Sequence, residues 1–185
     1  MANTHVPKEI ILDKRRMTLL LMLDKNSMNL DRVREIAEEE EFNEKSEFHI
    51  TIIGNTYGRA LVDHLVRISQ EDRERIIRKI EKLAVSYDWK FKIKNEAYEL
   101  SEKYKYAQPD GSEPVEDWKY SIITFISLSD LELFYIQLNK IIELDLVAPP
   151  AHVTLFTKGK NAERSRVGIG LKSMQEFENF NPIKI

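Results

Sequence analysis

Two short segments of the chain carry the same His-x-Thr triplet inside an apolar, β-branched run. They are residues 48–52 (FHITI) and residues 151–155 (AHVTL). Because side chains alternate between the two faces of a strand, each His projects to the same side as the Thr two positions later. The triplets therefore predict two strands that each present an imidazole beside a hydroxyl. These candidate site residues are His49 with Thr51 and His152 with Thr154.

The first triplet closes a predicted strand-helix-strand unit. Residues 17–24 form an apolar run of strand length, and residues 30–40 have the apolar spacing of a helix that Asn29 can cap. Residues 48–53 then form the strand with the first triplet. The order predicted here is strand, helix, His-x-Thr strand.

The second triplet closes a unit of the same kind. Residues 120–128 are predicted to form a strand, and residues 129–132 (SDLE) a capping box that begins a helix. Residues 151–157 form the closing strand. Two such copies, packed about a pseudo-two-fold axis, would bring both triplets into one cleft.

The spacing of the two units is nearly the same, since the separation of Met17 from His49 differs by one residue from that of Ser121 from His152. Alternation of polar and apolar positions favours antiparallel pairing. We expect a single domain over residues 1–185, of class α+β, in which two pseudo-two-fold related lobes have mostly antiparallel sheets with helices packed outside. The first motif lies near residues 48–54 and the second near residues 151–157.

Further elements are predicted between and after the two units. The sequence Pro109-Asp110-Gly111 signals a turn. The remaining expectations are a helix over residues 57–68, a second helix from Ser69 to about residue 87, a strand over 89–94, a polar loop or loose hairpin over 104–117 and a final strand over 166–171.

Composition limits the classes of function. The 185 residues are 42% hydrophobic and 32% charged, which is enough for the core of one full domain and carries no signature of disorder. A net charge of −3 argues against a protein that wraps a long phosphate backbone, so we expect a small or short anionic substrate and no long duplex nucleic acid. The absence of cysteine excludes disulfides, thiolate catalysis and cysteine zinc sites.

The apolar run of residues 17–23 follows Lys14-Arg15-Arg16 and resembles the start of a signal peptide. It begins late, is short and ends at Asp24-Lys25 without a small-residue cleavage site, so we interpret it as a buried strand. No segment approaches the length that spans a bilayer. The expectation is a cytoplasmic protein without a membrane partner.

The chain resembles the two-histidine (2H) phosphoesterase superfamily, because two His-x-Thr motifs lie about a hundred residues apart and each closes a strand-helix-strand unit. Its LigT-like members include RNA 2′,3′-cyclic phosphodiesterases. The resemblance spans roughly residues 17–171 and implies the LigT-like bilobed fold. It also implies catalytic roles for His49 and His152 and phosphate binding by Thr51 and Thr154.

Phosphodiester hydrolysis by two imidazoles and two hydroxyls can also be argued from the residues themselves, without the resemblance. Hydrolysis of a phosphodiester needs a proton taken from water, a proton given to the leaving oxygen, and stabilisation of charge on the phosphoryl oxygens. Near neutral pH, one imidazole can act as base and another as acid, while the two hydroxyls donate to the phosphate. The mechanism requires no metal and no cofactor. Which His is the base depends on how the substrate is oriented.

Weaker candidates for substrate binding lie near the motifs and in an aromatic-rich stretch. Tyr57 and Arg59 follow the first motif and Lys158 follows the second, where they can bind phosphate or stack a base. Trp118 and Tyr120 can line a nucleobase pocket, although aromatic residues in strands more often belong to the core.

The motifs leave several functions open. The leading hypothesis is a metal-independent phosphodiesterase that hydrolyses a 2′,3′-cyclic phosphate or a 2′-5′ linked or cyclic oligonucleotide. One alternative is a hydrolase of cyclic di- or trinucleotide second messengers, an anti-defence activity of some phage-encoded relatives. Others are a module that binds RNA ends or nucleotides and a 2′-5′ RNA ligase. A zinc site is the chemical rival, but no third ligand with motif spacing accompanies either His.

Overall fold

A computed structural model describes residues 4–28, 30–106, 113–159 and 167–185 of the chain. Its helices and strands show a mixed α+β protein, which confirms the expected class. The elements are β1 (Glu9–Asp13), β2 (Thr18–Met22), the 3-10 helix η1 (Lys25–Ser27), α1 (Asp31–Glu39), β3 (Asn43–Glu44), β4 (His49–Ile53), α2 (Asn55–Leu65), α3 (Gln70–Val85), β5 (Phe91–Tyr106), β6 (Val115–Leu128), α4 (Leu131–Ile142), β7 (His152–Gly159), α6 (Met174–Asn179) and β8 (Ile183–Lys184).

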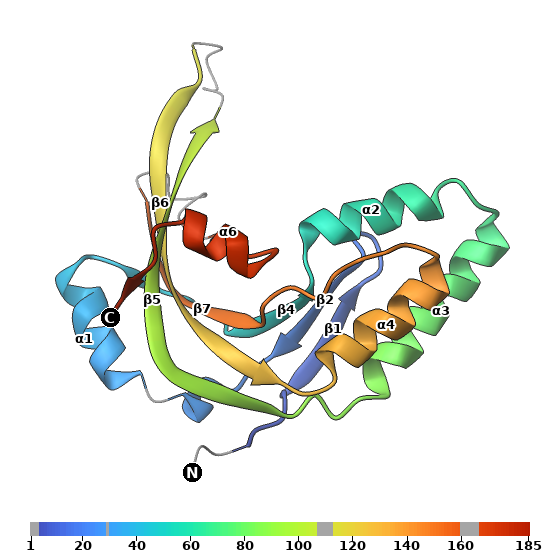
Figure 1. Ribbon diagram of the computed structural model, residues 1–185, viewed down its shortest axis with the longest axis horizontal. Coiled ribbons are helices and arrows are strands. Elements are labelled where there is room, and N and C mark those ends of the chain that lie inside the picture. The colour runs from blue at the N-terminus through green and yellow to red at the C-terminus, as the bar shows by residue number, and fades with distance from the viewer. Residues whose placement is uncertain (1–3, 29, 107–112, 160–166) are drawn as a thin grey trace.

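The described strands form one eight-stranded antiparallel sheet (Figure 1). Its order is β1-β2-β4-β7-β6-β5-β8, and the short β3 pairs with β7 off this path. The strands with the two His-x-Thr triplets, β4 and β7, are thus neighbours in the middle of the sheet. On either side of them lies the first strand of their own unit, β2 beside β4 and β6 beside β7.

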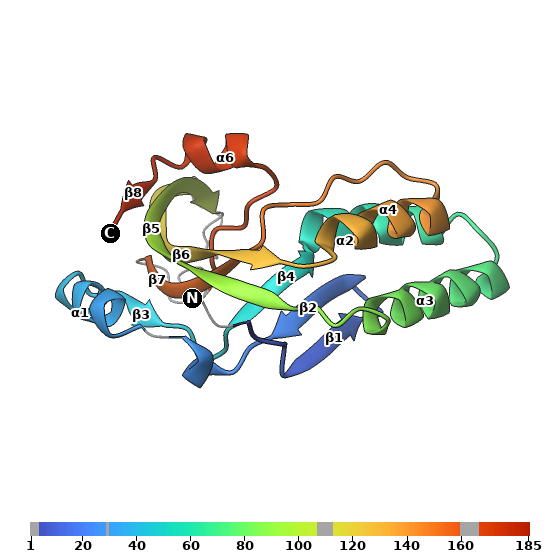
Figure 2. The ribbon, with the colours of Figure 1, turned by 60° about the horizontal axis from the view of Figure 1, so that its bottom comes forward.

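The helices gather over different parts of the sheet. In Figures 1 and 2, α2, α3 and α4 lie together beside the half that contains β1, β2 and β4. The buried hydroxyl of Tyr135 on α4 donates to the Ile52 carbonyl on β4 at 2.6 Å, which ties the second unit's helix to the first unit's strand. Figure 2 shows α1 and α6 at the other end of the molecule, on opposite sides of β5, β6 and β7.

The buried apolar side chains form a large cluster and a small one. The large cluster includes residues from both halves of the sheet, and its largest buried side chain is Trp89, whose indole N–H donates to the Ala84 carbonyl at 2.7 Å. The small cluster lies on the other face, under α6, and consists of Leu100, Ile123, Ile169, Leu171 and Phe177.

A β-bulge interrupts each triplet strand at the same place. Leu19 and Leu20 of β2 pair with Ile53 and Thr51, which leaves Ile52 of β4 as an extra residue. Ile122 and Ile123 of β6 pair with Phe156 and Thr154, which leaves Leu155 of β7 as an extra residue. In both strands the bulge directly follows the Thr of the triplet, where it changes the face to which later side chains point.

The expectation of a buried strand over the apolar run near the N-terminus is confirmed. Residues 18–22 form β2, and Leu19 and Leu21 have no exposed surface. No helix among the described residues is long and apolar enough to cross a membrane. The strand β1, which the sequence did not predict, pairs with β2 along its whole length.

Several local expectations were wrong. Residues 129–132 form no capping box, because Asp130 adopts a left-handed conformation (φ 64°) and the Ser129 hydroxyl donates to the Asp130 carboxylate instead. The described part of the expected final strand, residues 167–171, is not a strand, since the Ile169 N–H bonds to the Ser121 hydroxyl rather than to a backbone carbonyl.

Of the two expectations for residues 104–117, a polar loop or a loose hairpin, the described part agrees with the hairpin, because β5 continues to Tyr106, β6 begins at Val115 and these two residues pair. The predicted turn at Pro109-Asp110-Gly111 and the predicted cap at Asn29 lie outside the described residues.

The position of α2 depends on a close approach at Gly58, so Gly58→Ala should destabilise the protein. A Cβ there would lie 2.3 Å from the Arg16 carbonyl oxygen and 3.2 Å from that of Met17. Because both neighbours are backbone, we expect a loss of about 1–3 kcal/mol in the free energy of unfolding, despite the better helix propensity of Ala. Chemical denaturation measures the loss. The control is Asp63→Ala at an exposed site of the same helix, expected within about 0.5 kcal/mol of the parent, and an equally small effect at Gly58 would contradict the prediction.

Candidate functional site

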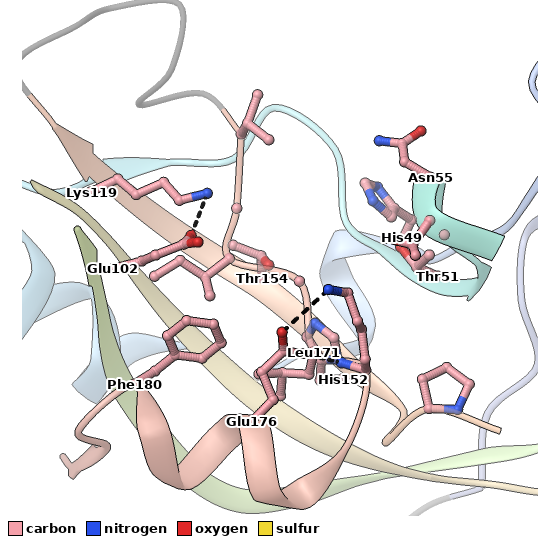
Figure 3. A pocket seen from close by; sticks show the side chains of 18 of the residues that line it. His49, Thr51, Asn55, Glu102, Lys119, His152, Thr154, Leu171, Glu176 and Phe180 are labelled. Carbon is pink, nitrogen blue, oxygen red and sulfur yellow. Dashed lines mark hydrogen bonds and ion pairs between the residues drawn. The ribbon is translucent and has the colours of Figure 1, made fainter. Parts of the chain in front are cut away.

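The two His-x-Thr triplets lie side by side at one pocket. Ile50 of β4 pairs with Val153 of β7 in antiparallel register. One residue to either side, this register sets His49 opposite Thr154 and Thr51 opposite His152, all on the face away from the buried Ile50 and Val153. All four side chains line a pocket of about 510 Å³ (Figure 3). The structure therefore brings together the four residues that the motifs predicted.

His152 is held in one orientation by the backbone that precedes it. Its Nδ1 lies 2.9 Å from the Pro150 carbonyl oxygen. A carbonyl only accepts hydrogen bonds, so Nδ1 carries a proton and the neutral ring keeps its lone pair on Nε2. Burial lowers the pKa of His152; the hydrogen bond to Pro150 opposes this change, and a charge on His49 adds to it.

His49 differs from His152 in its hydrogen bonding. Its Nδ1 is buried and has no hydrogen-bond partner among the described residues. Burial lowers the pKa of His49, the nearby Lys45 charge lowers it further, and Glu47 acts in the opposite direction. Both rings are therefore biased towards the neutral form, and a positive charge on one disfavours a positive charge on the other.

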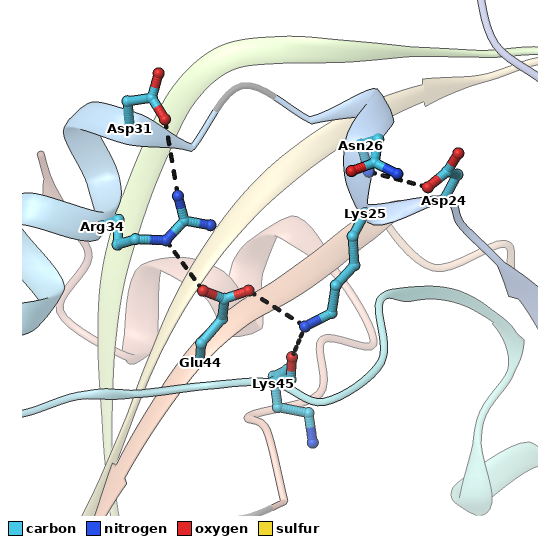
Figure 4. Close-up of polar contacts among 7 residues, drawn as sticks. All are labelled: Asp24, Lys25, Asn26, Asp31, Arg34, Glu44 and Lys45. Carbon is cyan, nitrogen blue, oxygen red and sulfur yellow. Dashed lines mark hydrogen bonds and ion pairs between the residues drawn. The ribbon is translucent and has the colours of Figure 1, made fainter.

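Lys45 reaches the pocket from a connection that ion pairs hold in place (Figure 4). The Lys25 ammonium donates to the Lys45 carbonyl at 2.7 Å and to the Glu44 carboxylate at 3.2 Å. Arg34 donates to the other oxygen of Glu44 at 3.1 Å. Burial tends to raise the pKa of Glu44, but the bonds from Arg34 and Lys25 outweigh it and the pKa is lowered. The network fixes the segment between β3 and β4, and with it a cation near His49.

The N-terminus of α2 forms one side of the pocket. The helix begins directly after β4, and Gly54, Asn55 and Thr56 line the pocket. The first amide groups of a helix have no intrahelical acceptor, and they carry the positive end of its dipole. Gly54 at the N-cap has no side chain that could bond to them. This end of the pocket therefore suits an anion.

The segment over residues 167–171 also lines the pocket. Gly168 passes so near Thr154 that a Cβ on it would lie 2.6 Å from the Thr154 hydroxyl oxygen. The bond from the Ile169 N–H to the Ser121 hydroxyl, 3.0 Å long, fixes the segment on β6. By contrast, a Cβ on Gly170 would meet no atom within 4 Å. Of these two glycines, Gly168 is therefore the one at which a side chain would collide with Thr154.

Of the weaker candidates, the structure brings Tyr57 alone to the pocket, and its hydroxyl donates to the Val147 carbonyl at 3.0 Å. The other four are not among the described residues that line it. Arg59 is exposed on α2. Trp118 is 43% exposed and stacks on Tyr120, while the Lys158 ammonium lies 5.3 Å from the ring of Phe42 and 5.9 Å from that of Tyr120.

The bulge in β7 explains why Lys158 does not line the pocket. After the extra residue Leu155, the side chains of β7 change face, so Lys158 no longer follows His152 and Thr154. It pairs with Tyr120 on the face towards Phe42, and Trp118 lies two residues before Tyr120 on that same face. The residue of β6 that does reach the pocket is Lys119, opposite Gly159.

Sequence reasoning missed several residues that line the pocket. Lys119 pairs with Glu102 of β5 at 2.6 Å, and Lys172 pairs with Glu176 at 3.6 Å. Phe180, at the end of α6, also lines it. The one available signal was alternation along β6, which places Lys119 on one face and Trp118 and Tyr120 on the other. Alternation alone does not indicate which of these faces lines the pocket.

The described residues contain no group of three or more His, Asp or Glu side chains that could hold a metal ion. In comparisons with protein-family models, curated proteins and solved structures, nothing matched the chain. The geometry of the pocket and the two motifs are therefore the basis for a functional proposal.

The two partly buried rings should make the protein less stable in acid. Because burial lowers the pKa of His49 and of His152, the unfolded chain binds these protons first as the pH falls. Their contribution to stability is complete above about pH 6.5 and is lost progressively as the pH falls from there through the folded-state pKa values. Chemical denaturation at several pH values between about 5 and 8 measures it. A variant with Gln at both positions should show a weaker dependence, and an unchanged dependence would contradict the prediction.

Proposed function

We propose that the chain is a metal-independent phosphodiesterase of the two-histidine phosphoesterase superfamily. Its substrates would be 2′,3′-cyclic phosphates or 2′-5′ linked or cyclic oligonucleotides, hydrolysed in the cytoplasm. The observation that carries the proposal is the register of β4 with β7, which sets two imidazoles and two hydroxyls around one pocket. A phosphodiester needs this set of donors and acceptors on either side of the phosphorus atom.

The proposed reaction divides proton transfer between the two rings. Neutral His152, with Nδ1–H held by Pro150, offers the Nε2 lone pair as the base that takes a proton from water. The water oxygen forms a bond to phosphorus as the bond to the leaving ribose oxygen breaks. His49, in its protonated form, gives that oxygen a proton. A charge on either ring disfavours a charge on the other, so the reactive form in this proposal is the pair with a single proton, on His49.

Charge on the phosphoryl oxygens would be stabilised by donors on both strands. The hydroxyls of Thr51 and Thr154 can each contribute about 1.5–3 kcal/mol towards a charged acceptor. The amide groups at the start of α2 and the ammonium of Lys45 add positive potential from the same side as His49.

The finer fold assignment also belongs to this proposal. The sheet order runs β1-β2-β4 and then β7-β6-β5, so each strand of the first unit has a counterpart at an equal distance from the centre. The two bulges lie at matching positions after the triplets. These equivalences support the pseudo-two-fold, bilobed LigT-like fold.

Replacement of either ring should abolish most of the activity. We expect His49→Ala and His152→Ala to lower kcat on nucleoside 2′,3′-cyclic phosphates by about 10²- to 10⁴-fold, the usual contribution of a positioned acid or base. Steady-state assays with and without EDTA measure this, and the chelator should have no effect. Circular dichroism checks the fold of the variants. Activity that survives the double variant would rule out the mechanism, and a loss in EDTA would favour the zinc rival.

A substrate panel separates the proposal from its alternatives. It contains nucleoside 2′,3′-cyclic phosphates, 2′-5′ oligoadenylates and cyclic dinucleotides. Turnover of cyclic dinucleotides alone would identify a second-messenger hydrolase. Binding without turnover would identify a nucleotide-binding module, and joining of a 5′-hydroxyl end to a cyclic phosphate would identify a ligase.

A matched pair of glycine variants tests the role of the Thr154 hydroxyl. Gly168→Ala should displace that hydroxyl and lower kcat by roughly 10- to 100-fold, which corresponds to one lost bond to a charged oxygen. Gly170→Ala, two residues away and in open space, should stay within about threefold of the parent. Equal rates for the two variants would show that the approach of Gly168 to Thr154 has no functional effect.

A further inference from the structure

The pocket extends well beyond the two rings. Along β6, Ile123 lies opposite Thr154, and Lys119 lies opposite Gly159 at the far end. Four residues of strand separate Ile123 from Lys119, a distance of about 13 Å at 3.3 Å per residue. A phosphate between the histidines fills only the near end of a pocket of about 510 Å³. The remaining length matches a nucleoside attached to that phosphate.

Three side chains of different chemistry form the far end. Glu102 of β5 lies directly opposite Lys119 of β6 in the ladder, and the two form an ion pair at 2.6 Å. The Lys119 side chain is only 18% exposed. Phe180 is held beside them, because its carbonyl accepts a hydrogen bond from the amide of Ser101, the neighbour of Glu102. Figure 3 shows the Phe180 ring and the Glu102 carboxylate on the same side of the pocket.

The other ion pair in the pocket has a structural role. The Glu176 carboxylate accepts a hydrogen bond from the Lys172 backbone amide at 2.6 Å, and the Ser173 hydroxyl accepts one from the Glu176 amide at 3.1 Å. These two bonds begin α6 in the manner of a capping box. Glu176 and Lys172 therefore hold the helix that carries Phe180, which leaves Glu102 and Lys119 to contact a ligand.

This combination has the properties of a nucleobase site. Aromatic side chains stack on the face of an unpaired base, and polar side chains bond to its edge. A lysine only donates hydrogen bonds and a carboxylate only accepts them. Guanine has the oxygen O6 beside two adjacent donors, N1–H and the 2-amino group, so one lysine and one carboxylate can satisfy all three. The Watson–Crick edges of adenine, cytosine and uracil lack such adjacent donors.

We propose that Phe180, Glu102 and Lys119 form a base site that favours guanine, in the nucleoside that carries the phosphate between the histidines. The proposal rests on the proposed function and specifies its substrate. Phe180 covers one face of the base. Lys119 donates to O6, and Glu102 accepts from N1–H and the 2-amino group.

Kinetics on the four nucleoside 2′,3′-cyclic phosphates test the base site. The guanosine compound should have the highest kcat/KM, by about tenfold over the uridine compound. Phe180→Ala should raise KM about tenfold for every base, with a much smaller effect on kcat, because stacking positions the substrate without taking part in proton transfer. Glu102→Gln should remove most of the preference for guanosine.

Matched variants control for indirect effects. Glu116→Gln alters another carboxylate of the same hairpin, one that pairs with Lys103 and Lys105 and is not among the described pocket residues. It should leave KM and base preference unchanged. Phe180→Tyr keeps the ring and should restore the parent KM. If thermal unfolding shows that Phe180→Ala is poorly folded, Glu102→Gln and Phe180→Tyr still decide the question.

Direct binding distinguishes failure of this proposal from failure of the proposed function. Calorimetry with guanosine 2′-monophosphate and the His49→Ala/His152→Ala variant should show binding that Phe180→Ala weakens about tenfold. If this binding is observed but the parent protein turns over none of the four substrates, the base site is supported and the phosphodiesterase function is ruled out. Turnover of all four substrates at equal kcat/KM, or values unchanged by Phe180→Ala and Glu102→Gln, would overturn the base site alone. Neither turnover nor binding would overturn both.

Discussion

The antiparallel contact between β4 and β7 is the constraint on which the candidate site depends. The contact is short, and Ile50 opposite Val153 fixes its register. Because the side-chain period of a strand is two, a slip by one residue would turn one triplet into the core and leave the other on the pocket face. Burial of Ile50 and Val153, both without exposed surface, opposes such a slip. Core packing therefore sets the relation between the two imidazoles.

The two bulges make this arrangement compatible with a continuous core. Beyond Thr51, Ile52 and Ile53 are both buried, and beyond Thr154, Leu155 and Phe156 are both buried. A regular strand would expose one residue of each pair. The extra residue in each strand lets the His and Thr side chains face the pocket while the two residues that follow are both buried in the apolar core. Because a bulge directly follows the triplet in both units, we interpret each triplet and its bulge as one structural feature.

Sequence predicted the parts of the site that depend on local alternation, and missed those that depend on register. His49 with Thr51 and His152 with Thr154 follow from a period of two within five residues. The choice of Lys119 over Trp118 and Tyr120 depends on the register of β6 against β7, which sets Ile123 opposite Thr154 and which no local pattern of β6 reveals. Likewise, Gly168 matters only because it crosses Thr154, and Phe180 only because its carbonyl reaches Ser101. Such contacts join residues far apart in the chain.

The electrostatics of the pocket explain how an acidic chain can select a small anion. The protein has a net charge of −3, yet three lysines and two glutamates are among the described residues that line the pocket. In addition, the first turn of α2 contributes the positive end of a helix dipole there. At physiological ionic strength, charges are screened over about 8 Å, so a bound phosphate experiences mainly this local excess of positive charge. A long polyanion would also meet the acidic remainder of the surface. The charge distribution thus favours a short anion held at one phosphate, which is the kind of substrate that the proposed function requires.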